Sequence, residues 1–143
     1  MPTRLSRLWS FGPLLLLACA QPPDISDDIE EYANLLSDAN HRACDCPQVL
    51  GYSSKVECDE ALGLIGTGER QCFATVLEGH EEAARDYLAC ANAAYQVYVD
   101  CLETNLDCDS GFYDQCTADH EAALSSCPLM PVDTQSAFEA CAD

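Results

Sequence analysis

Residues 90–127 read CANAAYQVYVDCLETNLDCDSGFYDQCTADHEAALSSC, and the spacing of the cysteines in this stretch predicts the fold. Cys90 and Cys101 are 11 residues apart, and Cys116 and Cys127 repeat this spacing. Eleven residues bring an α-helix back to nearly the same face, about 16.5 Å farther along its axis. Each half of the stretch therefore predicts a helix with cysteines along one face.

The polar segment 105–111 separates the two halves and predicts a reversal of the chain. The inner cysteines, Cys101 and Cys116, and the outer cysteines, Cys90 and Cys127, have the same midpoint, and it lies within this segment. If the chain folds back there, the two members of each pair meet across antiparallel helices. We therefore predict the disulfides Cys101–Cys116 and Cys90–Cys127.

We expect the hairpin helices over about 80–105 and 111–126, with Phe112 and Tyr113 facing inward on the second helix. This arrangement resembles the twin-cysteine α-hairpins of the coiled-coil-helix-coiled-coil-helix type. Those hairpins typically carry one residue fewer between the two cysteines of each helix. The resemblance is architectural, and no function is carried over from it.

The rest of the chain also has helical periodicity. Apolar residues three and four apart predict a first helix over about 25–43, with acids in its first turn, as the helix dipole favours. Further helices are expected from a cap at Ser53 or Ser54 to about Leu64, from near Glu69 onward, and after a cap at Asp133. Because no alternating run of β-branched residues predicts a strand, we expect an all-α, small disulfide-stapled helical bundle built around the hairpin.

A third disulfide is predicted by the same reasoning about chain reversal. Cys58 and Cys72 are centred beside the glycine-containing break at 66–68, which predicts a Cys58–Cys72 bridge. In the alternative pairing, Cys72 continues the cysteine face of the long hairpin helix and bonds to Cys141.

Four cysteines then remain. Cys44 and Cys46 are too close in sequence to bridge each other comfortably, so each is expected to bond to one of Cys108 and Cys141. Spacing does not determine which of them takes which partner. All ten cysteines from Cys44 onward are thus expected to be half-cystines.

The N-terminal residues 1–18 predict an export signal. Arg4 and Arg7 form a basic start, and the apolar run 14–18 follows. This run is far shorter than the roughly 20 residues that a spanning helix needs. We therefore expect a signal that is removed.

Residues 16–19, Leu-Leu-Ala-Cys, resemble the lipobox of bacterial lipoproteins. The resemblance implies that Cys19 becomes the mature N-terminus and carries acyl chains that attach the protein to the membrane. Because Ala20 is not Asp, it also implies sorting to the outer membrane. The alternative is a small-x-small cleavage site that releases a soluble, secreted protein starting at Gln21.

Three segments follow from this interpretation: a signal peptide at 1–18, lipid attachment and a short tether at 19–28, and a Cys-rich helical domain at 29–143. Removal of the signal takes away two basic residues and no acid, leaving 4 Lys and Arg against 25 Asp and Glu, a net charge near −21. Such a charge excludes nucleic acid as a partner, because binding to phosphates requires Lys and Arg. It also excludes electrostatic adhesion to anionic lipid.

His41, Cys44 and Cys46 form the strongest candidate for a chemical site. Two thiols and an imidazole at this spacing could bind zinc or act as a redox pair. In the competing interpretation, both cysteines are half-cystines and His41 is a cation at a helix C-terminus. Export and an even number of cysteines favour this second interpretation.

Other candidates are weaker. Residues 105–114 contain Asn105, Asp107, Asp109 and Asp114, which suggest a calcium loop or, more simply, helix caps. The tyrosines of the long helix suggest either a recognition strip or core packing: Tyr87, Tyr95 and Tyr98. His80 and His120 stand alone among acids, with no nucleophile that the spacing singles out.

No nucleotide, haem or hydrolase motif is present in the sequence. We therefore expect no enzymatic activity and no cofactor. The expected function is that of a lipid-anchored interaction or structural module of the cell envelope. Its expected partners are the membrane, through Cys19, and an unidentified envelope or extracellular protein.

Overall fold

The computed structural model describes residues 21–142. Its helices are α1 (Ser26–Ala43), the 3-10 helix η1 (Pro47–Leu50), α2 (Lys55–Leu62), α3 (Thr67–Leu77), α4 (Glu81–Glu103), α5 (Ser110–Ser125) and α6 (Val132–Glu139). No strand occurs in this range. The all-α prediction is confirmed, and the first helix includes the last three residues of the expected tether. None of these helices is long and apolar enough to span a membrane.

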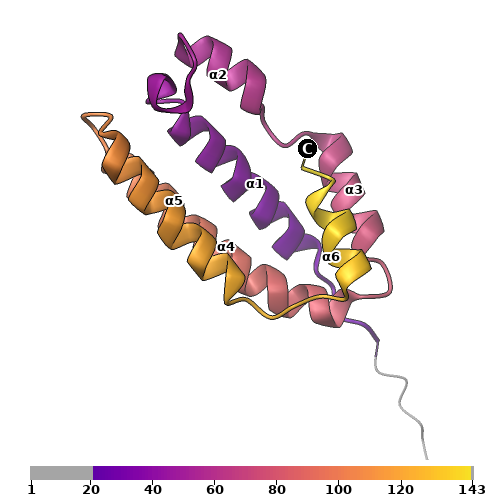
Figure 1. The fold of residues 1–143 in the computed structure, drawn as a ribbon. Helices are drawn as coiled ribbons and strands as arrows, with labels where there is room; N and C mark the ends of the chain where they lie inside the picture. Colours follow the sequence, from indigo (N-terminus) through magenta and orange to yellow (C-terminus); the bar gives the residue numbers. More distant parts are fainter. Residues whose placement is uncertain (1–20, 143) are drawn as a thin grey trace, which may run out of the picture.

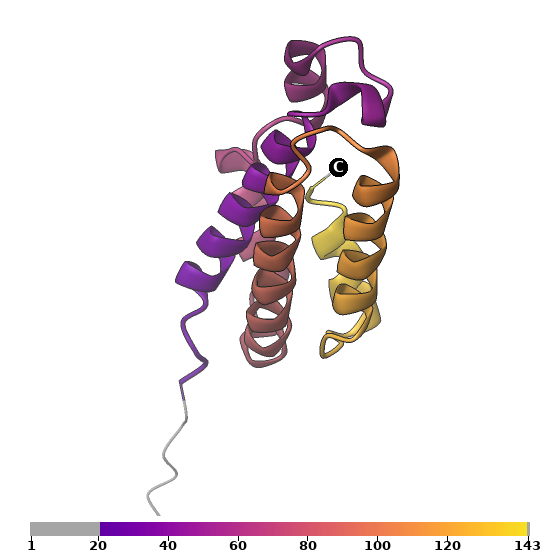
Figure 2. The same ribbon diagram turned by 90° about the vertical axis from the view of Figure 1, so that its left-hand side faces the viewer.

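The bundle is organised around α4, the longest helix. The first helix, α1, packs along one side of α4, and α5 returns antiparallel to α4 as the second arm of the predicted hairpin. The short helices α3 and α6 lie side by side at one end, whereas α2 and η1 lie beyond the other end of α1 (Figures 1 and 2). The molecule therefore has two distinct ends.

Several helix boundaries follow from capping residues that the sequence indicates. Ser54 caps α2, because its hydroxyl accepts a hydrogen bond from the Glu57 amide at 3.2 Å. Helix α3 ends at Leu77, and Gly79 lies in the turn that follows, with a φ of 83° that a helix does not allow. Helices α3 and α4 are therefore separate. The predicted cap at Asp133 is wrong: α6 already begins at Val132, and Pro131 holds the capping position.

The core is rich in aromatic rings. The Tyr32 ring on α1 meets the rings of Phe73 and Phe138, with centroids 5.5 and 5.1 Å away. Phe73 on α3 and Phe138 on α6 are almost completely buried. These contacts join three helices through one cluster, and offset or edge-to-face pairs of this kind add to the stabilisation from burial. Phe112, which we expected to face inward, is instead 40% exposed on α5.

Polar side chains also tie neighbouring segments to α1. The buried Asn92 amide on α4 donates to the Asp28 carbonyl at 3.1 Å. Ser37 accepts a hydrogen bond from the Ile65 amide at 3.0 Å, in the link between α2 and α3. These bonds fix the positions of α4 and of that link relative to α1.

Both disulfides predicted for the hairpin are present. Cys101–Cys116 joins α4 to α5, with a Cα–Cα distance of 5.9 Å. Cys90–Cys127 joins α4 to the second residue after the end of α5, with a Cα–Cα distance of 5.6 Å. The equal spacing on the two arms thus places both cysteine pairs opposite each other, as chain reversal at the turn requires.

The predicted Cys58–Cys72 bridge is wrong. Cys72 bonds to Cys141, which was the alternative pairing, and Cys58 bonds to Cys44. The prediction required a tight reversal between α2 and α3. The link at 63–66 instead runs without helical structure past α1, held by the bond between Ile65 and Ser37. Cys58 therefore remains beside the C-terminal end of α1, while α3 carries its cysteine to α6.

Of the two bridges expected for Cys44 and Cys46, one is present. Cys46 bonds to Cys108, which fixes the 3-10 helix region to the α4–α5 turn. Cys44 does not bond to Cys141, because the nearer Cys58 on α2 takes its place. All ten cysteines from Cys44 to Cys141 are half-cystines.

The Cys101–Cys116 bridge gives a test of the hairpin. Loss of a cross-link that closes a loop of about 15 residues is expected to cost about 3 kcal/mol. Cys101→Ser, Cys116→Ser and the double variant should lose similar amounts of unfolding free energy in urea, since each breaks the same bond. Losses that add up in the double variant would contradict the pairing.

Candidate functional site

The candidate thiol or metal site at the end of α1 has no free thiol in this structure. Cys44 and Cys46 lie in two different disulfides, so neither offers a thiolate. His41 is exposed near the C-terminus of α1, and its Nδ1 lies 3.5 Å from Oδ1 of Asp59. Within residues 21–142, no three His, Cys, Asp or Glu side chains gather in a metal-binding arrangement.

The polar loop between α4 and α5 forms caps. The Asn105 side chain accepts from the Asp109 amide at 2.9 Å and donates to the Asp109 carbonyl at 3.0 Å. Asp109 in turn accepts from the Phe112 amide at 2.8 Å, at the first turn of α5. The capping interpretation is confirmed for these two residues, whose side-chain oxygens bind backbone amides.

The tyrosines of α4 pack against other helices. Tyr87 is buried against Phe138, and the partly buried Tyr95 meets Tyr32 edge-on at 5.4 Å. Tyr98 lies at the α4–α5 interface, where its hydroxyl is 3.4 Å from that of Thr117. These side chains contribute to packing, as the core interpretation predicts.

His120 on α5 is not isolated among acids, contrary to the sequence-based expectation. Its ring stacks on Tyr98, with centroids 4.5 Å apart and planes 12° apart, and lies 4.4 Å from the Tyr95 ring. Burial lowers the pKa of His120, an effect that the Ala94 backbone and the Glu121 carboxylate oppose. The sequence signal that could have revealed this site is the spacing of the two tyrosines, one helical turn apart on the facing arm. His80, by comparison, is exposed at the start of α4.

The structure adds a cleft that the sequence did not indicate, which we call the α1–α2 cleft. Its volume is about 320 Å³, and its lining residues are Asn40, His41, Val56, Asp59, Glu60, Leu62, Gly63 and Leu64. Val56 and Leu64 are 66% and 73% exposed, although both are apolar. The available signal was a group of apolar residues within and just after α2 that fits no helical face.

The walls of the α1–α2 cleft are held in place by several bonds. The Asn40 amide on α1 donates to the carbonyls of Leu62 and Gly63, at 3.2 and 3.3 Å. The Cys44–Cys58 disulfide joins the same two helices a short distance away. The cleft is therefore built from covalently joined elements, and it combines an apolar wall with the acidic side chains of Asp59 and Glu60.

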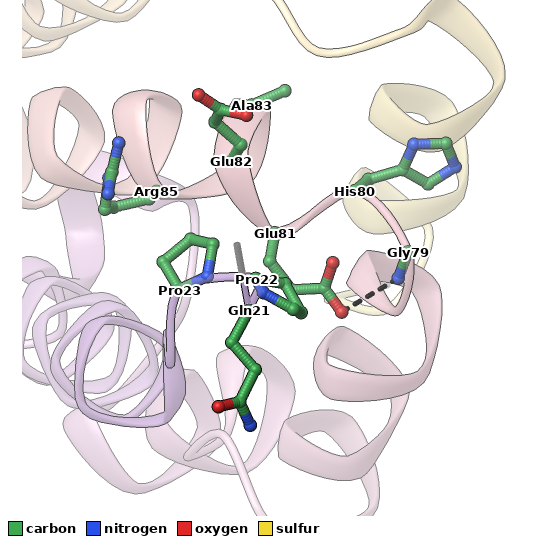
Figure 3. A pocket seen from close by; sticks show the side chains of 9 residues that line it. All are labelled: Gln21, Pro22, Pro23, Gly79, His80, Glu81, Glu82, Ala83 and Arg85. Atoms are coloured by element: carbon green, nitrogen blue, oxygen red, sulfur yellow. Dashed lines mark hydrogen bonds between the residues drawn. The ribbon is translucent and has the colours of Figure 1, made fainter. Parts of the chain in front are cut away.

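A larger and more open hollow of about 770 Å³ lies at the other end of α1. Figure 3 shows its lining, which combines Gln21, Pro22 and Pro23 with the turn between α3 and α4. There the Glu81 carboxylate accepts a hydrogen bond from the Gly79 amide at 2.9 Å. The side chains around this hollow form no catalytic constellation, but they show that the N-terminal segment lies against the domain.

No protein-family model, curated protein or solved structure matches this chain.

The environment of His120 predicts a pH-dependent stability. Because burial lowers the folded-state pKa, the neutral imidazole is favoured in the folded protein. An unfolded chain titrates near 6.5, so this contribution is complete above that pH and is lost as the pH falls through the lower folded-state pKa. We expect a lower urea midpoint at about pH 5.5 than at about pH 7.5.

Two variants assign this effect. His120→Phe keeps an aromatic ring against the tyrosines and should remove most of the difference between the two pH values. His80→Gln, at the exposed histidine, should leave the difference unchanged. A difference that persists in His120→Phe would show that another group causes it.

Proposed function

We propose that this chain is an extracytoplasmic, lipid-anchored interaction module without enzymatic activity. The observation that carries the proposal is the cysteine pairing. Five disulfides use all ten cysteines from Cys44 to Cys141, and such density is typical of proteins in an oxidising compartment outside the cytoplasm. Of the 11 cysteines in the sequence, only Cys19 lies outside these bridges.

With the other ten cysteines paired, Cys19 is available for lipid attachment, whereas cleavage before Gln21 would leave the same ten. A disulfide from Cys19 to another cysteine of the same chain would require one of the five bridges to open. The lipobox-like residues 16–19 supply a role that needs no disulfide, because lipid modification uses the cysteine without oxidising it. Each acyl CH₂ buried in a bilayer contributes about 0.8 kcal/mol, so several chains give a stable anchor without a spanning helix. Cys19 lies outside the described residues, and its proposed role is supported by the lipobox-like sequence 16–19 and by the pairing of the other ten cysteines.

The anchor is tested by the mass of the mature protein and by a substitution. We expect an N-terminus at Cys19 with the added mass of acyl chains, and recovery of the protein in the membrane fraction. Cys19→Ala should move the protein to the soluble fraction. An unmodified N-terminus at Gln21 would instead establish the alternative, a soluble secreted protein of the same fold.

We further propose that the α1–α2 cleft is the docking surface, and that its partner presents an apolar side chain flanked by Lys or Arg. The exposed Val56 and Leu64 offer apolar contact, and Glu60 and Asp59 add negative charge to the lining. A volume of about 320 Å³ is near the lower end for ligand pockets, which suits a side chain or two better than a cofactor.

The charge of the rest of the domain favours the same partner. Its four cations all contact acids; the closest pairs are Arg42 to Glu103, Lys55 to Asp45, Arg70 to Glu30 and Arg85 to Asp86. Because 25 acidic residues stand against these four cations, the domain as a whole keeps a strong negative charge. Such a field speeds the association of basic partners and repels acidic ones.

Synthetic peptides test the cleft. An amphipathic helical peptide of Leu and Lys should bind, and the same peptide with Glu in place of Lys should not. Leu64→Asp adds negative charge but removes apolar contact, so we expect it to weaken binding of the basic peptide about tenfold, measured by fluorescence anisotropy.

Leu106→Asp is the matched control, because Leu106 is equally apolar and 88% exposed but lies on the α4–α5 turn. It adds the same charge and should not weaken binding. If Leu64→Asp binds the basic peptide as tightly as Leu106→Asp does, the attraction is diffuse and the cleft is not the docking surface.

A further inference from the structure

The short distance between Cys19 and the domain determines which end of the molecule lies at the membrane, if Cys19 carries the proposed lipid. Only Ala20 separates Cys19 from Gln21, the first described residue. An extended chain spans at most about 3.6 Å per residue, so the attachment point lies within about 7 Å of Gln21. Residues 21–23 in turn line the hollow beside the α3–α4 turn.

The chain is also fixed to the domain directly after this segment. Ile25 is buried in the core, 6% exposed, and α1 begins at the next residue. The tether is therefore too short to hold the domain away from the bilayer. The end that contains the start of α1 must lie at the lipid surface.

Two other parts of the fold lie at this same end. Figures 1 and 2 both place the α3–α4 turn and the link between α5 and α6 at the end from which the N-terminal segment leaves. The link and the first residue of α6 carry two of the most exposed apolar side chains in residues 21–142: Leu129 is 85% exposed and Val132 is 79% exposed.

The link holds these side chains outward. Cys127 and Met130 are buried, 5% and 4% exposed, and Cys127 is also bonded to Cys90 on α4. Pro128 and Pro131 restrict the backbone on either side of Leu129. Because Met130 after it and Cys127 two residues before it are held in the core, the backbone at Leu129 is fixed with its side chain exposed.

We propose that Leu129 and Val132 insert into the interfacial region of the bilayer that holds the lipid anchor, and so orient the domain. Scattered exposed apolar residues are common on soluble proteins and need no explanation individually. What distinguishes this pair is its position at the end where the chain must meet lipid.

The charges at this end select the kind of surface. Asp133 follows Val132 directly, and Glu81 and Glu82 lie on the adjacent turn at the start of α4. These carboxylates are repelled by anionic headgroups and limit how deeply the end can sink. The expected surface is therefore zwitterionic lipid, contacted by apolar side chains rather than through charge attraction.

The inference rests on the proposed anchor, and tryptophan fluorescence tests the two separately. The only tryptophan in the chain is Trp9, within the predicted signal, so the mature protein offers no background. Leu129→Trp and Val132→Trp place a probe at each proposed contact. Leu106→Trp is the matched control, since Leu106 is 88% exposed on the α4–α5 turn at the far end of the hairpin.

Each variant is prepared as the lipid-modified mature protein on phosphatidylcholine vesicles with brominated acyl chains. We expect quenching at Leu129→Trp and Val132→Trp to be at least about threefold stronger than at Leu106→Trp, with blue-shifted emission. Adding anionic lipid should reduce this difference, because the carboxylates oppose close approach.

Flotation of the same vesicles reports on the anchor independently. Protein that floats with the vesicles but is quenched equally weakly at all three positions would overturn the inference and leave the anchor intact. Wild-type protein that floats no better than Cys19→Ala, or whose mass shows no acyl chains, would overturn both the anchor and the orientation that depends on it.

Discussion

Disulfide bonds between helices are the constraint on which the rest of this structure depends, because the outer helices α2 and α5 bury few of their own side chains. In α2 only Cys58 is buried, and in α5 only Cys116. Each of these buried residues is a half-cystine: Cys58 is bonded to Cys44 directly after α1, and Cys116 is bonded to Cys101 on α4. Helices with so little buried surface gain little stabilisation from packing, so the bridges supply much of what holds α2 and α5 to the larger helices. The disulfides thus occupy the positions that a larger protein would fill with core side chains.

The sequence predicted those parts of the fold in which local spacing determines geometry. The two arms of the hairpin repeat the same interval around one polar turn, so the pairings of Cys101 and Cys90 could be derived. The pairing of Cys58 could not, because it depends on the path of the link at 63–66. That path is set by a bond between Ile65 and Ser37, residues far apart in the sequence. The α1–α2 cleft was missed for the same reason, since its walls meet only after the link has crossed α1.

The acidic composition has a structural consequence as well as a functional one. An excess of negative charge favours expansion of the chain through self-repulsion. Few cations are present to offset this, and the pairs they form are mostly exposed, where single ion pairs contribute little. Cross-links that limit the unfolded ensemble do not depend on charge or salt. A small acidic domain with a core of aromatic rings and alanines can therefore remain folded when five disulfides reduce the entropy gained on unfolding.

The N-terminal segment and the α1–α2 cleft lie at opposite ends of the bundle. Helix α1 is 18 residues long, about 27 Å at 1.5 Å per residue. The N-terminal segment leaves at its first turn, whereas the α1–α2 cleft begins at Asn40, near its last turn. A domain attached to lipid through Cys19 would thus hold the cleft at about the length of one helix from the bilayer, facing outward. The α1–α4 packing that sets this distance is braced by the Cys46–Cys108 disulfide near the end of α1 and by the hydrogen bond from Asn92 to the Asp28 carbonyl near its start, so the membrane-facing and outward-facing surfaces keep a fixed separation. In this arrangement an anchor and a docking surface require no flexible linker between them.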